Sequence, residues 1–346
     1  MRKRASFVNY LLSHNGVGNM TVVKLFRLFP DFNDLVNNFE KNEKIPNDIK
    51  KIIFKALSQE KEEEDNIITI WDAVYPNLLK QIYDPPVRLF YKGNLDFLNN
   101  VGISIVGTRK SSAYGKKVTQ KLIEFLEGYP VFTVSGMALG IDSFVHYESL
   151  KRNIKTVAIL GSGIDNITPK SNQALFDEIV HKENLVLSEY PNDTNVVPGM
   201  FASRNRIIAG MSKVTVIVEA GQKSGALITA RLALDNNRDV FAVPGNIFSE
   251  MSNGTNMLIT QGEACLLHNF NQILEALNLK KISTSKSNRP KLRQDLEELL
   301  DIFQKNNMLT PDEVGKITQK NNYLSLLGEL ELLGLIERVG GAYTLS

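Results

Sequence analysis

The sequence has only one cysteine, Cys265, and four histidines in 346 residues. A single cysteine excludes an internal disulfide and a zinc site of the CxxC type, and it fits a reducing cytosol. No window approaches 18 consecutive apolar residues, so we expect no membrane-spanning helix. The basic N-terminus also lacks the long apolar stretch and the small-residue cleavage site of a secretory signal. These absences predict a cytoplasmic protein without membrane contact.

The sequence also has little excess charge, with a formal net charge of only +2. A uniformly basic, histone-like protein is therefore excluded, and any nucleic-acid site must be a local patch. The histidines are scattered, none stands with a serine or cysteine in a nucleophile arrangement, and no set of metal ligands is visible. The sequence thus predicts no catalytic site, no metal and no cofactor.

The first part of the chain, residues 1–62, carries helical apolar patterns and predicts a small helical domain. Within it, HNGVGNMTVVKLFRLF (14–29) has the form of a helix-hairpin-helix element (SAM-like). The N–H groups of such a hairpin can bind a DNA phosphate, although the hairpin can equally be a packing corner. The acidic run EKEEED at 60–65 predicts the domain boundary.

Residues 66–278 alternate near-continuous apolar runs with segments of helical period. This alternation predicts a Rossmann-like, doubly wound α/β domain with a mainly parallel sheet covered on both faces. Nearly every run ends in glycine or a polar pair, so small residues gather at the carboxyl edge, where open α/β sheets bind ligands. The predicted strands are 101–107, 131–136, 156–161, 185–190, 214–220 and 239–245, and the helices between them include 114–127, 141–152 and 224–237.

The end of the chain divides into a linker and a further domain. Residues 279–291 are basic, without an acidic residue, and predict a flexible linker. Residues 292–346 predict a winged helix of three helices and a hairpin, with Thr310 as an N-cap and Pro311 at the first helical position. Such a tail would contact either duplex DNA or another protein.

Three loops follow the first predicted strands. In GTRKSSAYG (107–115) the N–H groups that open a helix can hold a phosphate, and Arg109 supplies a planar fork. In SGMALGID (135–142), Gly136 permits either a close ligand approach or only a tight turn. LGSGIDNITPK (160–170) contains Gly161 in an incomplete GxGxxG without its acidic partner, which disfavours a dinucleotide, while Lys170 can reach a phosphate.

A fourth region joins FASRNRIIAGMS (201–212) to VEAGQKSGALITA (218–230). Arg204, Asn205 and Arg206 open a helix there, and two arginines are costly to bury unpaired, which favours an anionic partner. The segment GQKSG lacks the lysine position of a Walker A loop, so ATP hydrolysis is not indicated. Two carboxylates, Glu189 and Glu219, end strands nearby and would act as general bases or pair with the arginines.

Taken in order, these motifs together with LSEYP, VFAVPG and GTNMLITQGEA resemble those of the DNA-processing protein A family (DprA, also called Smf) of bacteria. The resemblance implies a homodimeric cytoplasmic protein that binds incoming single-stranded DNA in natural transformation, during competence, and loads the RecA recombinase onto it. Carried over by motif, the DNA contacts are Arg109, Lys170, Phe201, Arg204, Asn205 and Arg206, with Phe201 as a base-stacking platform.

We therefore interpret the protein as a non-catalytic single-stranded DNA-binding recombination mediator. An alternative is a lysine-decarboxylase-like (LOG) phosphoribohydrolase acting on nucleoside monophosphates, although the PGGxGTxxE pattern expected there is missing. In the preferred interpretation the cations neutralise successive phosphates and the glycines let the strand approach the backbone. The expected DNA-binding residues are Gly107, Arg109, Gly136, Gly161, Lys170, Phe201, Arg204, Asn205, Arg206, Lys223, Ser224 and Gly225.

Overall fold

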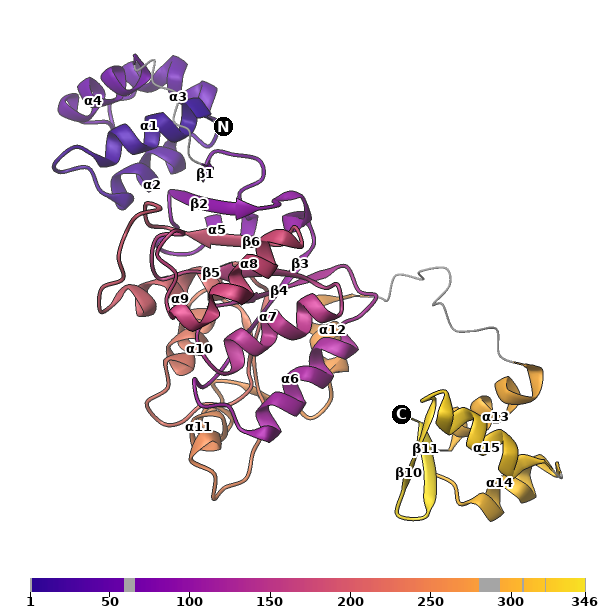
Figure 1. Ribbon diagram of the computed structural model, residues 1–346. Helices are drawn as coiled ribbons and strands as arrows, with labels where there is room; N and C mark the ends of the chain where they lie inside the picture. The colour runs from indigo at the N-terminus through magenta and orange to yellow at the C-terminus, as the bar shows by residue number, and fades with distance from the viewer. Residues whose placement is uncertain (1, 59–65, 280–292, 307, 321, 346) are drawn as a thin grey trace. The chain divides into compact units, whose positions relative to one another are not determined.

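The computed structural model describes residues 2–58, 66–279, 293–306, 308–320 and 322–345 (Figure 1). The chain divides into two compact units, 1–282 and 283–346. The predicted acidic boundary at 60–65 and nearly all of the predicted basic linker lie outside the described residues.

Four helices open the first unit, and they share an apolar core with the beginning of the α/β region. The Trp71 indole packs edge-on against Phe7, Phe26 and Phe32, and its Nε1 donates a hydrogen bond to the Phe29 carbonyl at 2.8 Å. The helices and the sheet region are thereby held together by one continuous core. These helices are α1 (Arg2–Leu12), α2 (Asn19–Leu28), α3 (Phe32–Asn38) and α4 (Asn47–Leu57).

The first unit contains a nine-stranded sheet in the order β1-β2-β6-β5-β4-β3-β7-β8-β9. The mainly parallel α/β fold is confirmed, because all six predicted strands are present and parallel, with ends within three residues of those expected. These strands are β3 (Val101–Val106), β4 (Val131–Ser135), β5 (Lys155–Ile159), β6 (Leu185–Ser188), β7 (Val214–Ile217) and β8 (Asp239–Ala242).

Three further strands at the edges were not expected. β1 (Ile67–Thr69) and β2 (Arg88–Gly93) pair antiparallel and extend the sheet beyond β6, while β9 (Cys265–Leu266) adds a parallel strand beside β8. Two of them have three residues or fewer, and β2 is partly exposed. Segments as short as β1 and β9 carry no periodicity that distinguishes them from loops, and only Leu89 and Phe90 of the six residues of β2 are buried.

Helices cover both faces of the sheet. The apolar residues of α6, α7 and α12 pack on one face, with α8 beside α7, and those of α9, α10 and α11 pack on the other. A short helix, α5 (Asn77–Lys80), contacts α9. The covering helices are α6 (Ala113–Phe125), α7 (Ile141–Lys151), α8 (Gln173–His181), α9 (Met200–Gly210), α10 (Gly225–Asp235), α11 (Asn253–Thr260) and α12 (Asn271–Leu277).

The strand order reverses between β3 and β7. From β3 the chain continues to β4 on one side, whereas β7 on the other side continues outward to β8. The loops that leave β3 and β7 therefore diverge at the carboxyl edge and open a crevice between them, which is the usual ligand position in doubly wound sheets.

The second unit has three helices and a two-stranded antiparallel sheet in the predicted order. Leu299, Leu326 and Leu330 are buried at its centre. A capping box begins one helix: Thr310 accepts from the Glu313 N–H, and the Glu313 carboxylate accepts from Thr310, which lowers the pKa of Glu313. The elements are α13 (Gln294–Lys305), α14 (Pro311–Thr318), α15 (Tyr323–Leu332), β10 (Ile336–Val339) and β11 (Ala342–Leu345).

Across the described ranges of both units, we find no helix long and apolar enough to span a bilayer.

The core of the sheet gives a first prediction. Ile105 on β3 is fully buried, whereas Ile247 is 75% exposed. Ile105→Ala should lower the free energy of unfolding by about 2–5 kcal/mol, because it removes buried methyl groups and leaves a cavity. Ile247→Ala should change it by less than about 0.5 kcal/mol. Urea denaturation followed by circular dichroism measures both, and equal losses would show that β3 does not lie in the core.

Candidate functional site: a pocket at the strand ends

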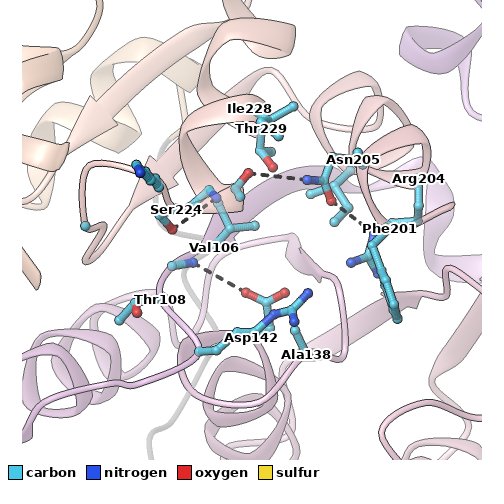
Figure 2. A pocket seen from close by; sticks show the side chains of 18 of the residues that line it. Val106, Thr108, Ala138, Asp142, Phe201, Arg204, Asn205, Ser224, Ile228 and Thr229 are labelled. Atoms are coloured by element: carbon cyan, nitrogen blue, oxygen red, sulfur yellow. Dashed lines mark hydrogen bonds between the residues drawn. The ribbon is translucent and has the colours of Figure 1, made fainter. Parts of the chain in front are cut away.

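A pocket of about 570 Å³ lies at the carboxyl edge between the loops that follow β3 and β7 (Figure 2). The first turns of α9 and α10 form its other walls. The structure thus brings together residues from three of the motifs identified in the sequence. Eight of the predicted site residues line the pocket: Gly107, Arg109, Phe201, Arg204, Asn205, Lys223, Ser224 and Gly225.

Two exposed cations stand on the pocket lining, Arg109 and Lys223. The guanidinium carbon of Arg109 lies 5.5 Å from the centroid of the Phe201 ring, within the range of a cation–π contact. Neither cation forms an ion pair with any carboxylate in the part of the chain that the structure describes. An anion that enters the pocket would therefore meet two positive groups that no internal carboxylate neutralises.

The start of α10 adds backbone donors to the same wall. The Ser224 hydroxyl caps the helix by accepting from the Ala226 N–H at 3.3 Å. A Cβ added to Gly225 would meet no atom within 4 Å, so the backbone is open to the pocket at this point. A helix N-terminus with accessible backbone favours an anionic ligand group.

Arg204 forms part of the pocket floor and is 4% exposed. Its Nη1 donates to the carbonyl oxygens of Gly136, at 2.6 Å, and of Ile159. Its Nε donates to Asn205 Oδ1 at 3.2 Å, and Asn205 Nδ2 in turn donates to the Gly225 carbonyl at 3.4 Å, as the dashed lines in Figure 2 show. Burial lowers the pKa of Arg204 to about 10, which leaves it charged at neutral pH.

The charge of Arg204 is balanced by Asp142, which is buried in the same floor. Burial raises the pKa of Asp142 above its usual value, and the field of Arg204 and hydrogen bonds from the N–H groups of Gly107 and Gly136 offset this rise only in part. The predicted phosphate contact of Arg204 stays a prediction, because most of the guanidinium already has partners in the floor. Its Nη1 and Nε are hydrogen-bonded to two carbonyls and an amide inside the protein, and the nearby Asp142 carboxylate interacts with it electrostatically.

The glycines at the strand ends serve the protein's own packing. A Cβ on Gly136 would lie 2.5 Å from Arg204 Nη2, and one on Gly161 would lie 2.9 Å from the Phe201 ring. A Cβ on Gly107 would lie 2.6 Å from the Ile141 side chain. The space at the Cβ positions of these three glycines is filled by the protein's own atoms, whereas the space at Gly225 is open, and the approach of a DNA strand at these glycines stays a prediction.

Arg206 lies outside the pocket. Its Nη2 is 2.5 Å from Glu189 Oε1, and its Nε is 3.3 Å from Asp84 Oδ2. Burial alone would lower the pKa of Arg206, but Glu189 and Asp84 outweigh it and raise the pKa. Glu189 also accepts from Asn19 Nδ2 at 3.0 Å, so this pair ties α9 to the N-terminal helices. The predicted phosphate contact at Arg206 is corrected to an internal ion pair.

Lys170 is also absent from the pocket lining. It is exposed in a short 3₁₀ helix, Lys170–Asn172, and it directly precedes Ser171 on the lining of a neighbouring hollow. Lys170 thus remains an accessible cation, but at a different place on the carboxyl edge.

The sequence did not single out Asp142, which is buried beside Arg204. It is the last residue of SGMALGID (135–142), in the loop that follows a predicted strand. A carboxylate at that place was the only feature of the sequence that could have indicated a role at the carboxyl edge. Thr108, Ile228, Thr229 and Met251 also line the pocket and were not predicted, because their residue types carry no chemical signature.

Glu219 binds Ser112, the residue that caps α6. Its Oε2 accepts from the Ser112 N–H at 3.0 Å and its Oε1 from the Ser112 hydroxyl at 2.5 Å, so both oxygens face the start of α6. Gly115 is required beside it, since a Cβ there would lie 2.2 Å from Glu219 Oε2. The carboxylate that the phosphoribohydrolase alternative needs thus accepts hydrogen bonds from the N-cap residue of α6.

The model of the family called DNA recombination-mediator protein A matches residues 66–278. Curated relatives include DNA processing protein DprA of Streptococcus pneumoniae, 44% identical over 56% of this chain and 68% of that protein. DprA of Bacillus subtilis is 41% identical over 60% of this chain and 70% of its own length, and protein Smf of Escherichia coli is 36% identical over 66% and 61%.

A comparison with solved structures finds members of the same family. The X-ray structure of DprA from Streptococcus pneumoniae superposes with a TM-score of 0.66 at 34% identity, covering 78% of this chain and 97% of that one. DNA processing protein A from Helicobacter pylori, described for its single-stranded DNA binding mode, superposes with a TM-score of 0.55 at 29% identity, covering 62% of this chain and 97% of that one.

The floor of the pocket yields a stability prediction. Arg204→Met should lower the free energy of unfolding by about 3–5 kcal/mol, because it leaves the buried Asp142 carboxylate uncompensated. Asp142→Asn in the same chain should recover part of that loss. The matched control is Arg109→Met at the exposed position, with an expected change below about 0.5 kcal/mol. Chemical denaturation measures all three, and a control as unstable as Arg204→Met would contradict the assignment.

His146, on α7 beneath the site, gives a pH prediction. It is fully buried, its Nδ1 lies 2.7 Å from Thr156 Oγ1, and burial lowers its pKa to about 3. In the unfolded chain the His146 imidazole binds a proton as the pH falls below about 6.5, whereas in the folded chain it stays neutral until the pH approaches 3. The free energy of unfolding is therefore unaffected above pH 6.5 and decreases as the pH drops towards 3.

At pH 5 this loss should amount to about 2 kcal/mol. Denaturation midpoints at pH 7.5 and 5 should show a smaller pH-dependent loss for His146→Gln than for the parent. His268→Gln, at an exposed position, should keep the parent's dependence. A slope unchanged by His146→Gln would mean that the buried imidazole does not titrate as described.

Proposed function

The chain belongs to the DNA recombination-mediator protein A family, and we propose that it binds single-stranded DNA in the pocket between β3 and β7. The observation that carries this proposal is the pair of unneutralised cations, Arg109 and Lys223, on the lining that also holds the Phe201 ring. Single-strand binders combine a cationic track with aromatic platforms in this way.

Each group has a distinct role in this proposal. Arg109 and Lys223 bind phosphates, and the Phe201 ring stacks on a base. The open backbone at Gly225 and the N-terminus of α10 add an uncharged anion contact. Arg204 Nη1 and Nε and the Asn205 side chain are hydrogen-bonded within the floor, so in this proposal Arg204, Asn205 and Asp142 hold α9 and its Phe201 in position.

Similarity to known proteins supports the same ligand. The Helicobacter pylori protein is described by its single-stranded DNA binding mode, and its fold covers 62% of this chain. On this basis we propose a non-enzymatic recombination mediator in the cytoplasm, which protects DNA that enters during natural transformation and loads RecA onto it. We also propose a homodimer, since two linked pockets would raise the avidity for one strand.

For the C-terminal unit, proposed as a winged helix, the charge distribution favours a protein contact over duplex DNA. Residues 293–346 contain nine acidic and five basic side chains. Its helix α15 has Glu329 and Glu331 and neither lysine nor arginine. A helix that enters the major groove needs cations for the flanking phosphates, and this one would be repelled.

We expect Arg109→Ala and Lys223→Ala each to weaken binding to single-stranded DNA and to reduce the salt slope of log K by about 0.7, because each removes one phosphate contact. Lys121→Ala is the matched control, since Lys121 is exposed on α6 and lies 3.6 Å from Glu124. Fluorescence anisotropy at several salt concentrations measures the slopes. Parent-like slopes in both pocket variants would exclude this pocket as the DNA site.

Removal of residues 293–346 should leave the affinity for duplex DNA unchanged, because this acidic segment contributes no favourable phosphate contact. The remaining chain keeps the complete first unit up to the end of α12. Gel shifts with a duplex, with the full chain as reference, test this expectation. A clear loss of duplex binding on truncation would assign residues 293–346 to DNA.

A further inference from the structure

A second hollow, of about 720 Å³, adjoins the pocket on the carboxyl edge. Arg109 lines both, so the two hollows meet at its side chain. The second hollow is formed by the loop that leads into α6, the first turns of α7, and the start of α8. None of the motif residues predicted as DNA contacts, other than Arg109, lines it.

The second hollow is cationic. Lys110 and Lys116 are exposed on its lining, and among the described residues neither is ion-paired with a carboxylate. Glu178 also lines the hollow, but its carboxylate lies 2.8 Å from Lys182 Nζ. Together with Arg109, these lysines place a group of unneutralised charges beside the pocket, although the whole chain carries a net charge of only +2.

The same hollow exposes apolar rings. Phe144 and Tyr147 on α7 lie stacked, with centroids 6.2 Å apart and an interplanar angle of 22°. Tyr147 is 50% exposed, and Leu139 beside the helix start is 46% exposed. In a single strand of nucleic acid, bases alternate with phosphates. The aromatic rings can stack on the bases, and the lysines without carboxylate partners can bind the phosphates.

We propose that a DNA strand bound in the first pocket crosses Arg109 and continues into this second hollow. There its bases lie against the Phe144–Tyr147 pair and its phosphates lie at Lys110 and Lys116. Lys170, which precedes Ser171 on the lining, then extends the cationic track. This inference rests on the proposed function, and it specifies the ligand as a polymer of several nucleotides instead of a single nucleotide.

The test compares a short oligothymidylate of about 4 nucleotides, which fills the first pocket, with one of about 16 nucleotides. Tyr147→Ala and Lys116→Ala should each weaken binding of the long strand, Tyr147→Ala by on the order of tenfold, and leave the short strand unchanged. Tyr147→Phe keeps the ring and should restore the affinity of the long strand. Matched controls are Tyr83→Ala, at a tyrosine 81% exposed elsewhere, and Lys121→Ala.

The outcomes separate the inference from the proposed function. If the parent binds neither oligonucleotide, the proposed function fails. If the parent binds both, and Arg109→Ala weakens both, but Tyr147→Ala and Lys116→Ala bind the long strand as tightly as the parent, the second hollow holds no DNA and the inference alone is overturned. Equal weakening of both lengths also overturns it, because the two residues would then act only through the first pocket.

Discussion

The buried guanidinium of Arg204 is the contact on which the pocket depends. It binds the carbonyl oxygens of Gly136, after β4, and Ile159, in β5, and faces the Asp142 carboxylate, so one side chain joins two strand ends to α9. A buried charge is costly unless hydrogen bonds and an opposite charge compensate it. The position of this guanidinium also explains the glycine at 136, because a Cβ there would lie 2.5 Å from Arg204 Nη2. Because α9 is held in this way, Phe201 lies against Gly161 and under the Arg109 guanidinium.

This arrangement divides the cations of the carboxyl edge into two groups. Arg204 and Arg206 are buried or largely buried and are neutralised by Asp142, Glu189 and Asp84. Arg109, Lys110, Lys116 and Lys223 are exposed and, in the described part of the chain, have no carboxylate partner. A chain with a net charge of +2 can therefore have a strongly cationic edge, because the nearby carboxylates interact with the buried arginines and not with the exposed cations. The proposed strand follows the second group from Lys223 over Arg109 to Lys116.

The parallel strands could be predicted because each is a nearly continuous run of apolar, β-branched residues, as in β3 and β7, which only a sheet covered on both faces accommodates. The meeting of the GTR, RNR and GQKSG segments followed from strand polarity, since loops after parallel strands share one edge. The sequence could not assign the arginines of RNR, because burial and carbonyl partners are set by residues far along the chain, such as Ile159 and Asp84. The packing role of the glycines could not be predicted for the same reason: the sequence shows that a Cβ is absent but not which atom occupies its place.

The most direct test is a crystal structure of the protein with a bound oligothymidylate. The account predicts a phosphate between Arg109 and Lys223, a base on the Phe201 ring, and Arg204 still bonded to the carbonyls of Gly136 and Ile159. A strand bound elsewhere on the surface, or an Arg204 side chain that leaves the floor to bind a phosphate, would contradict it.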